Sequence, residues 1–145
     1  MIRIVSGDEV GRWVCDRMQG ASFHVGGAQA IGCERDFWLI AGAIFENWTG
    51  RSMTIHWAVD ERIPKTFLHA IADYAFNKCE IEKLIAPVDT GNKDMAKLAF
   101  KLGFTREAMI RNAGRTGDIA LFTMPKKNCR FLSPRYAETL EVIHG

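Results

Sequence analysis

The sequence has no closely spaced cysteine pair and no long apolar run, and both absences restrict the class of protein. Its four cysteines are far apart and form neither a Cys-x-x-Cys pair nor a Cys/His cluster of the kind that binds zinc. We therefore expect no metal site and reduced, mostly buried thiols. No stretch approaches the roughly 18 uninterrupted apolar residues of a membrane span, and charged residues interrupt the start of the chain. These absences predict a cytoplasmic protein with no membrane partner.

An excess of charge of one sign is also missing. The 19 Lys and Arg residues stand against 17 Asp and Glu residues, so the formal net charge is only +2. Such a balance gives no global field that would recruit nucleic acid. The chain also lacks internal repeats and Pro/Gly/Ser linkers, and its 145 residues suffice for one compact domain. We place that single domain at residues 1–132, followed by a C-terminal tail at residues 133–145.

Apolar periodicity and turn residues predict an alternation of strands and helices. The expected strands cover residues 2–5, 29–33, 37–48, 53–59, 83–88, 104–110 and 118–124. The expected helices cover residues 10–18, a segment that begins with Pro64, the segment 92–103, and part of 134–145. Short polar turns favour antiparallel pairing, and only the passage from the fourth to the fifth strand is long enough for a parallel crossover. This order predicts an α+β fold with a mixed, mostly antiparallel central sheet and helices on both faces.

The second half of the chain contains the stretch LIAPVDTGNKDMAKLAFKLGFTRE. In it, a strand ends at Val88, Asn92 opens a helix, Leu-Gly-Phe at 102–104 closes that helix, and Glu107 follows. With the element order, this stretch resembles the GCN5-related N-acetyltransferase (GNAT) superfamily, and the resemblance extends from residue 2 to residue 132. It implies the acyl-CoA N-acyltransferase fold, with acetyl-CoA as acyl donor. The implied reaction is direct transfer of an acetyl group to a primary amine of a small molecule or protein.

The resemblance also implies residues that bind the cofactor. In this family, two neighbouring strands separate and the pantetheine arm of the cofactor lies between them; here these strands end at Val59 and Val88. Backbone groups of Trp57, Ala58 and Val59 would then bind the arm. Asn92 would bind the pantetheine amide or cap its own helix, and a carboxamide has donors and an acceptor for both roles.

The glycine-rich loop that binds the cofactor's pyrophosphate in most family members is missing. Residues 60–66 read DERIPKT, a shorter segment without the glycines that let backbone amides approach a phosphate closely. We expect the first turn of the next helix, the cations of Arg62 and Lys65, and the Thr66 hydroxyl to bind the phosphates instead. The alternative is an ordinary helix start whose charges are solvated.

Acyl transfer also needs a base for the amine. His56 has a suitable unperturbed pKa of roughly 6.5, but strand alternation places it on the face opposite Ile55, where the family's base commonly lies. Glu46 is the alternative base, acting through water. A structural histidine and an exposed carboxylate are the simpler explanations of these two residues. The tyrosine that many family members use as proton donor is replaced by Ala99.

Two other functions remain open at this point. Ala99 and the glycine-free loop are compatible with a noncatalytic protein of the same fold that binds acyl-CoA or a protein partner. A nucleic-acid-associated function would use a short set of basic residues: Arg106, Arg111, Arg115, Lys126, Lys127 and Arg130. An ordinary solvent-exposed face explains this set better than a nucleic-acid site does. The sequence identifies neither the amine acceptor nor the oligomeric state, and a homodimer is compatible with it.

Side chains that could border an acceptor pocket come from the first helix, the loop after it and the last hairpin. The candidates are Phe23, His24, Trp38, Trp48, Trp57 and the loop 111–115. Core packing is the default explanation for any one of the aromatic residues.

Overall fold

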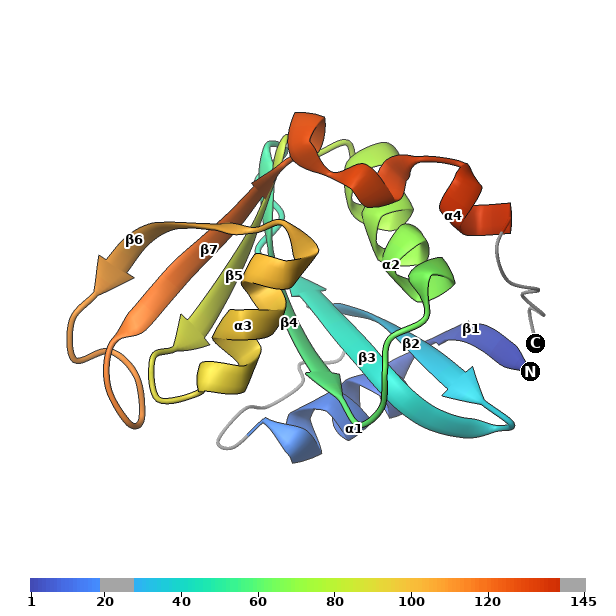
Figure 1. The fold of residues 1–145 in the computed structure, drawn as a ribbon, viewed down its shortest axis with the longest axis horizontal. Coiled ribbons are helices and arrows are strands. Elements are labelled where there is room, and N and C mark those ends of the chain that lie inside the picture. Colours follow the sequence, from blue (N-terminus) through green and yellow to red (C-terminus); the bar gives the residue numbers. More distant parts are fainter. Residues whose placement is uncertain (19–27, 139–145) are drawn as a thin grey trace.

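The structure, a computed structural model, describes residues 1–18 and 28–138. Within these residues, seven strands form one sheet in the order β1-β2-β3-β4-β5-β7-β6 (Figure 1). The strands are β1 (Ile2–Ser6), β2 (Gln29–Arg35), β3 (Trp38–Glu46), β4 (Ser52–Val59), β5 (Lys83–Asp89), β6 (Thr105–Ile110) and β7 (Ile119–Pro125). Every neighbouring pair is antiparallel except β4 and β5, which are parallel. The predicted mixed, mostly antiparallel sheet is therefore confirmed.

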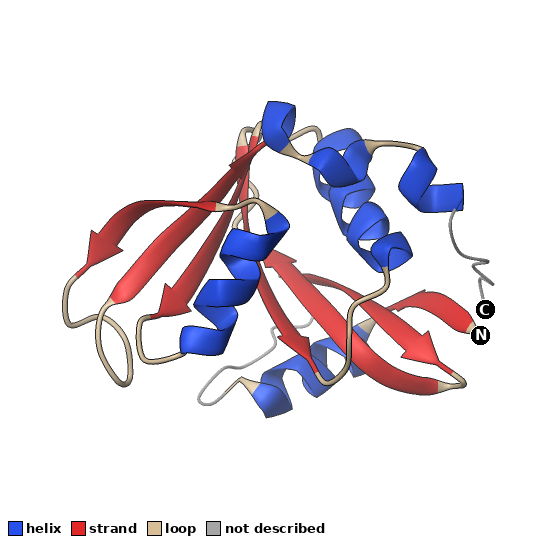
Figure 2. Cartoon of the chain, viewed as in Figure 1, coloured by secondary structure: helices blue, strands red, loops and turns tan. Residues whose placement is uncertain are grey.

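Helices cover both faces of the sheet, as predicted (Figures 1 and 2). They are α1 (Asp8–Arg17), α2 (Lys65–Ala72) with a π-helical continuation η1 (Asp73–Lys78), α3 (Lys93–Leu102), the 3₁₀ turns η2 (Lys126–Asn128) and η3 (Arg130–Leu132), and α4 (Arg135–Glu138). Helix α1 packs with Ile44 and Ala58 on one face, whereas α2 and α3 enclose the larger core on the other. No helix among the described residues combines the length and apolar composition needed to cross a membrane.

Two glycines allow α1 to lie close against the sheet. Gly32 of β2 is paired with Gly42 of β3, and a Cβ added at Gly42 would lie only 2.6 Å from Cγ2 of Val14. Any side chain at this position would force α1 outward. The close packing fixes the end of α1, and with it Arg17 and Met18, beside the functional site described below.

The ends of the helices follow the local sequence. In α3, Oδ1 of Asn92 accepts a hydrogen bond from the Met95 N–H at 3.1 Å, and Gly103 ends the helix in the left-handed conformation with a φ of 103°. Pro64 precedes α2 as the N-cap rather than occupying its first turn, because its ψ of 142° is extended. That placement shifts the start of the predicted helix by one residue.

The segment after residue 132 packs more firmly than a loosely held tail would. Tyr136 is only 6% exposed, and its ring lies 5.4 Å from that of Phe131. Its carbonyl oxygen accepts a hydrogen bond from the Thr66 hydroxyl of α2. The core therefore extends into the first residues of the predicted tail, while residues 139–145 of that tail lie outside the described residues.

Candidate functional site

Strands β4 and β5 part from each other soon after they begin. Their parallel pairing ends at Thr54 and Ile85, after three residue pairs. Beyond that point β4 continues along β3 as far as Val59, while β5 continues along β7 as far as Asp89. Figure 1 shows the two strands diverging on either side of α3. The sheet thus contains the wedge-shaped opening on which the acyltransferase hypothesis depends.

A proline helps to keep the opening from closing. The Thr90 N–H donates to the Asp118 carbonyl oxygen at 2.8 Å, and main-chain groups along an antiparallel strand alternate in direction. Pro87 therefore directs its backbone toward β4, where its missing N–H removes one donor that a continued ladder would need. The sequence of β5 itself thus disfavours longer pairing with β4.

The facing edge of β4 presents unpaired backbone groups. The Asp60 N–H donates to the Ile40 carbonyl oxygen at 2.8 Å, so alternation directs the N–H and C=O of Trp57 and Val59 into the opening. The backbone of Ala58 instead faces β3. The backbone groups of Trp57 and Val59 are therefore available to a ligand, as the prediction requires. Ala58 lines the opening, but its backbone groups are directed away from it.

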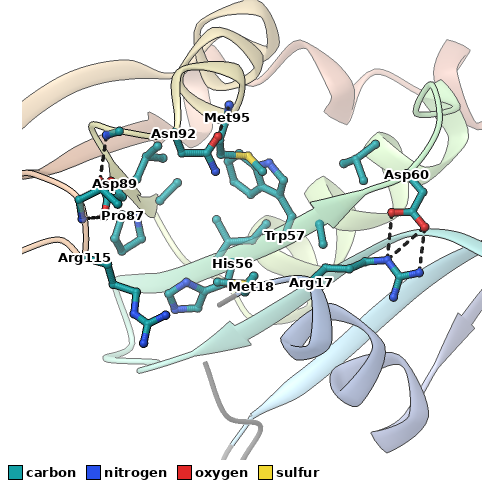
Figure 3. Close-up of a pocket in the computed structure, with 17 residues that line it drawn as sticks. Arg17, Met18, His56, Trp57, Asp60, Pro87, Asp89, Asn92, Met95 and Arg115 are labelled. Atoms are coloured by element: carbon teal, nitrogen blue, oxygen red, sulfur yellow. Dashed lines mark hydrogen bonds and ion pairs between the residues drawn. The ribbon is translucent and has the colours of Figure 1, made fainter. Parts of the chain in front are cut away.

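A cavity of about 700 Å³ occupies the opening and reaches both faces of the sheet. Trp57 and Met95 line it on the α3 side, whereas Met18 and His56 line it on the α1 side (Figure 3). The complete lining is Arg17, Met18, Ile55, His56, Trp57, Ala58, Val59, Asp60, Ala86, Pro87, Val88, Asp89, Gly91, Asn92, Met95, Arg115 and Thr116. Such a passage could hold two molecules that approach each other from opposite faces.

The α3 side of the cavity contains a buried hydrogen-bond donor that lacks an acceptor. Trp57 is 8% exposed, and its indole Nε1 has no partner among residues 1–18 and 28–138. Leaving such a group unpaired costs about 1–3 kcal/mol. The indole lies beside Met95, and Asn92 follows on the same side (Figure 3). Since Oδ1 of Asn92 caps α3, its amide NH₂ is the part left for a ligand.

On the α1 side, the two candidate bases form one pair. Nε2 of His56 lies 2.7 Å from Oε1 of Glu46, and both side chains are partly exposed. The β3–β4 register has no bulge, so His56 remains on the face that strand alternation predicts. It nevertheless reaches the cavity, because the opening passes through the sheet. With its proton on Nε2, the ring donates to Glu46 and keeps the Nδ1 lone pair for a ligand.

The residues predicted to bind phosphate lie at the start of α2, outside the cavity lining. Arg62 and Lys65 are exposed there, and the Lys65 Nζ lies 5.8 Å from the centre of the Tyr136 ring. Thr66 is buried, and its hydroxyl already donates to the Tyr136 carbonyl oxygen at 3.4 Å. The Phe67 N–H, in the first turn of α2, donates to the Pro64 carbonyl oxygen at 3.0 Å. The groups at the start of α2 that remain available to bind an anion are therefore the side chains of Arg62 and Lys65 and the first two backbone N–H groups of the helix.

The acidic residues of the same loop are neutralised. Asp60 accepts hydrogen bonds from the Arg17 guanidinium at 2.9 Å and 3.1 Å, and this pairing lowers the pKa of the carboxyl group. Glu61 forms an ion pair with Arg35 at 3.5 Å. The repulsion that these acids would exert on a phosphate is correspondingly reduced.

A tyrosine proton donor is missing from the described part of the cavity lining. Ala99, at the position of the family's tyrosine, is fully buried in α3. Tyr74 packs against Phe45 on the other helical segment, and burial raises its pKa to about 12.

A network of hydrogen bonds ties the β6–β7 loop to the end of β5. The Asp89 carboxylate accepts bonds from the Gly91 N–H, the Thr116 N–H and the Thr116 hydroxyl at 2.9, 3.1 and 2.8 Å, and these donors lower its pKa to about 2. The Asp118 N–H also donates to the Thr90 hydroxyl oxygen at 3.0 Å. This network brings Arg115 to the cavity rim (Figure 3).

Five further residues border the site without having been predicted from the sequence: Asp89, Thr116, Met95, Arg17 and Met18. For Asp89 and Thr116, the sequence contains one indication, a pair of glycine-containing turns: DTGN after β5 and GRTGD in the β6–β7 loop. Their contact is long-range and could not be inferred from either turn alone.

Some other candidates have different positions. Trp38 and Trp48 are strongly exposed and do not line the cavity, while Phe23 and His24 lie outside the described residues. Within the basic set, Arg130 donates to the carbonyl oxygens of Lys101 and Leu102 at the end of α3. That contact gives Arg130 a structural role.

No protein-family model and no curated protein sequence matches this chain. Solved structures do match it. A variant of the spermidine N-acetyltransferase SpeG from Vibrio cholerae aligns with a TM-score of 0.68 and 14% identity, covering 92% of this chain and 98% of that chain. The N-acetyltransferase PseH from Campylobacter jejuni, solved with acetyl coenzyme A, aligns with a TM-score of 0.62 and 14% identity, covering 87% and 99%. This chain therefore has the fold of the GCN5-related N-acetyltransferases.

Proposed function

We propose that this protein is an N-acetyltransferase that moves an acetyl group from acetyl-CoA directly to a primary amine. The observation that carries the proposal is the cavity that passes through the sheet where β4 and β5 part. It offers unpaired backbone groups and an unpartnered indole on one face, and a His–Glu pair on the other. Both structural relatives described above are named N-acetyltransferases, and PseH was solved with acetyl-CoA.

The α3 side of the cavity suits the donor. The backbone groups of Trp57 and Val59 can pair with the amides of the pantetheine arm as an added strand would. The Trp57 indole and the Asn92 amide supply further donors for its carbonyl oxygens. Arg62, Lys65 and the first amides of α2 would hold the phosphates.

The α1 side of the cavity suits the amine. Bound acetyl-CoA would supply a thioester carbonyl group, and the Val59 N–H would donate to its oxygen as negative charge develops there. Nδ1 of His56 accepts the proton that the amine loses, while Glu46 holds the ring through Nε2 and balances the positive charge that results. Water protonates the departing thiolate, since Ala99 replaces the usual donor.

The test measures cofactor binding and turnover on the same preparation. Acetyl-CoA at about 100 times its Kd should stabilise the folded protein by about 2.7 kcal/mol, which corresponds to a Tm increase of roughly 5–10 °C for a domain of this size. Thiol release should then depend on an added amine. The absence of any Tm increase at millimolar acetyl-CoA would refute the proposal.

A second candidate function is favoured by one observation, the buried Ala99 at the position where many members of the family carry a tyrosine. In that case the protein binds acyl-CoA, or a protein partner, and does not transfer the acyl group. A Tm increase without thiol release for any amine of a broad panel would support this second function. Amine-dependent thiol release would exclude it.

A further inference from the structure

We propose that the acceptor amine carries an anionic group, a carboxylate or a phosphate, which Arg115 binds at the α1-side mouth of the cavity. This inference rests on the proposed function and specifies its substrate class. Arg115 belongs to the loop between β6 and β7, is exposed, and lines the cavity. Its side chain points toward the His56 ring (Figure 3). A ligand held by Arg115 would therefore lie beside the proposed base.

Arg115 differs from Arg17, the other arginine of the cavity lining, in having no ionic partner among the described residues. The two acidic lining residues already have partners: Asp60 is bound by Arg17, and Asp89 accepts three hydrogen bonds. Glu46, behind the lining, is engaged with His56. Within residues 1–18 and 28–138, Arg115 forms no ion pair, although its guanidinium could bind a carboxylate or phosphate through two parallel hydrogen bonds. Asp60 is paired with a cation, whereas Asp89 keeps its negative charge beside neutral donors, so a polycationic amine is the competing acceptor that the experiment must include.

The loop that bears Arg115 is held in place before any ligand binds. Thr116, the next residue, donates twice to Asp89, and the Gly114 N–H donates to the Gly117 carbonyl oxygen at 2.9 Å. Gly114 also packs so closely that a Cβ there would lie 2.6 Å from Oδ2 of Asp89. Asp89 is thus a positioning residue for Arg115. Such preorganisation reduces the entropy that ligand binding would otherwise lose.

Acetyl-CoA is itself an anion, so the position of Arg115 relative to the start of α2 matters. Asp60, which leads into α2, lies at the opposite end of the cavity from Arg115 (Figure 3). The cations proposed for the cofactor phosphates, Arg62 and Lys65, lie beyond Asp60 in the chain. The structure therefore separates two cationic regions, one for each substrate.

The experiment compares matched amines. Thiol release would be measured with β-alanine against propylamine, with O-phosphoethanolamine against ethanolamine, and with spermidine. We expect kcat/KM to be at least about tenfold higher for an anionic member than for its neutral partner. Arg115→Ala should abolish that preference mainly through KM, and Arg115→Lys should retain part of it. Arg111→Ala is the matched control, since Arg111 is exposed in the same loop but does not line the cavity.

Each remaining outcome counts against the inference. Equal rates within both pairs, a preference for spermidine, a preference that survives Arg115→Ala, or no turnover of any anionic amine would overturn it. Loss of the acetyl-CoA Tm increase in Arg115→Ala would assign Arg115 to the cofactor and overturn it as well. The effect of acetyl-CoA on the Tm of the wild-type protein distinguishes failure of this inference from failure of the proposed function. If the Tm rises but anionic amines are not preferred, only the proposed substrate class is overturned. If the Tm does not rise, the proposed function itself is refuted.

Discussion

The two sides of the opening differ in how they are built. The β4 side lies on a continuous strand, paired with β3 without a bulge, and it presents His56 and the backbone of Val59. The β5 side ends in turns, and its functional groups come from Asn92 and from a loop tied to Asp89. The β4 side thus carries the proposed base together with the backbone groups proposed to bind the cofactor, while the β5 side contributes binding groups from turns and loops, whose sequences vary more easily than those of strands.

The largest expected effect concerns the β4 side. His56→Gln should lower kcat by roughly 10²–10⁴-fold, because it removes the proton acceptor, and should leave the acetyl-CoA Tm increase unchanged. Glu46→Gln should have a smaller effect in the same direction and shift the pH profile of kcat. Steady-state thiol release between pH 5 and pH 9 measures both. Thr54→Val, on the same face of the same strand, is the control, and an active His56→Gln variant would leave His56 with a structural role only.

The next effect tests the packing that holds the β4 side in place. Gly42→Val should destabilise the protein by about 1–3 kcal/mol, since the added side chain collides with Val14. Urea unfolding measures this loss. Gly50→Ala is a useful comparison for crowding, because a Cβ there meets nothing within 4 Å and any cost comes from its φ of +90° alone. If the Gly42→Val variant had wild-type stability, α1 would not be packed as closely as the structure shows.

The β5 side should respond to pH in a particular window. The hydrogen bonds to Asp89 lower its pKa to about 2, below the roughly 3.9 of an unfolded chain. Their contribution to stability is therefore complete above about pH 4 and is lost as the pH falls through about 2. Asp89→Asn should flatten the acid limb of the unfolding profile between pH 5 and pH 2, and it should raise KM for an anionic amine at neutral pH. An acid limb identical to that of the wild type would contradict the network.

The smallest effect concerns the start of α2. Arg62→Ala combined with Lys65→Ala should reduce the acetyl-CoA Tm increase without changing kcat at saturating acetyl-CoA, because exposed cations contribute modestly. Lys126→Ala with Lys127→Ala is the charge-matched control, since both lysines are exposed and lie outside the cavity lining. An unchanged Tm increase in the first double variant would remove these two residues from the site.

The sequence predicted those features that depend on local patterns. Asn92 and Gly103 marked the two ends of α3, and strand alternation placed Ile55 and His56 on opposite faces. Both conclusions need only neighbouring residues, which is why they agree with the structure.

Features that depend on strand register or on returning loops were not predicted. His56 and Glu46 were treated as alternative bases because their contact requires the β3–β4 register, in which Glu46 is opposite Thr54 and diagonal to His56. The Asp89–Thr116 contact depends on how the β6–β7 hairpin returns to β5. Tyr136 was assigned to the C-terminal tail because no periodic pattern marks a single buried aromatic residue in this segment.

Pro87 has a consequence for how a ligand would enter. Since β5 presents no N–H to β4 at this position, an incoming extended molecule need not displace a main-chain hydrogen bond there. Binding between the strands would then resemble the filling of a gap rather than the exchange of one sheet partner for another. Little rearrangement of the free protein should precede association, and the rate of capture should be governed by diffusion and by the charges at the two mouths.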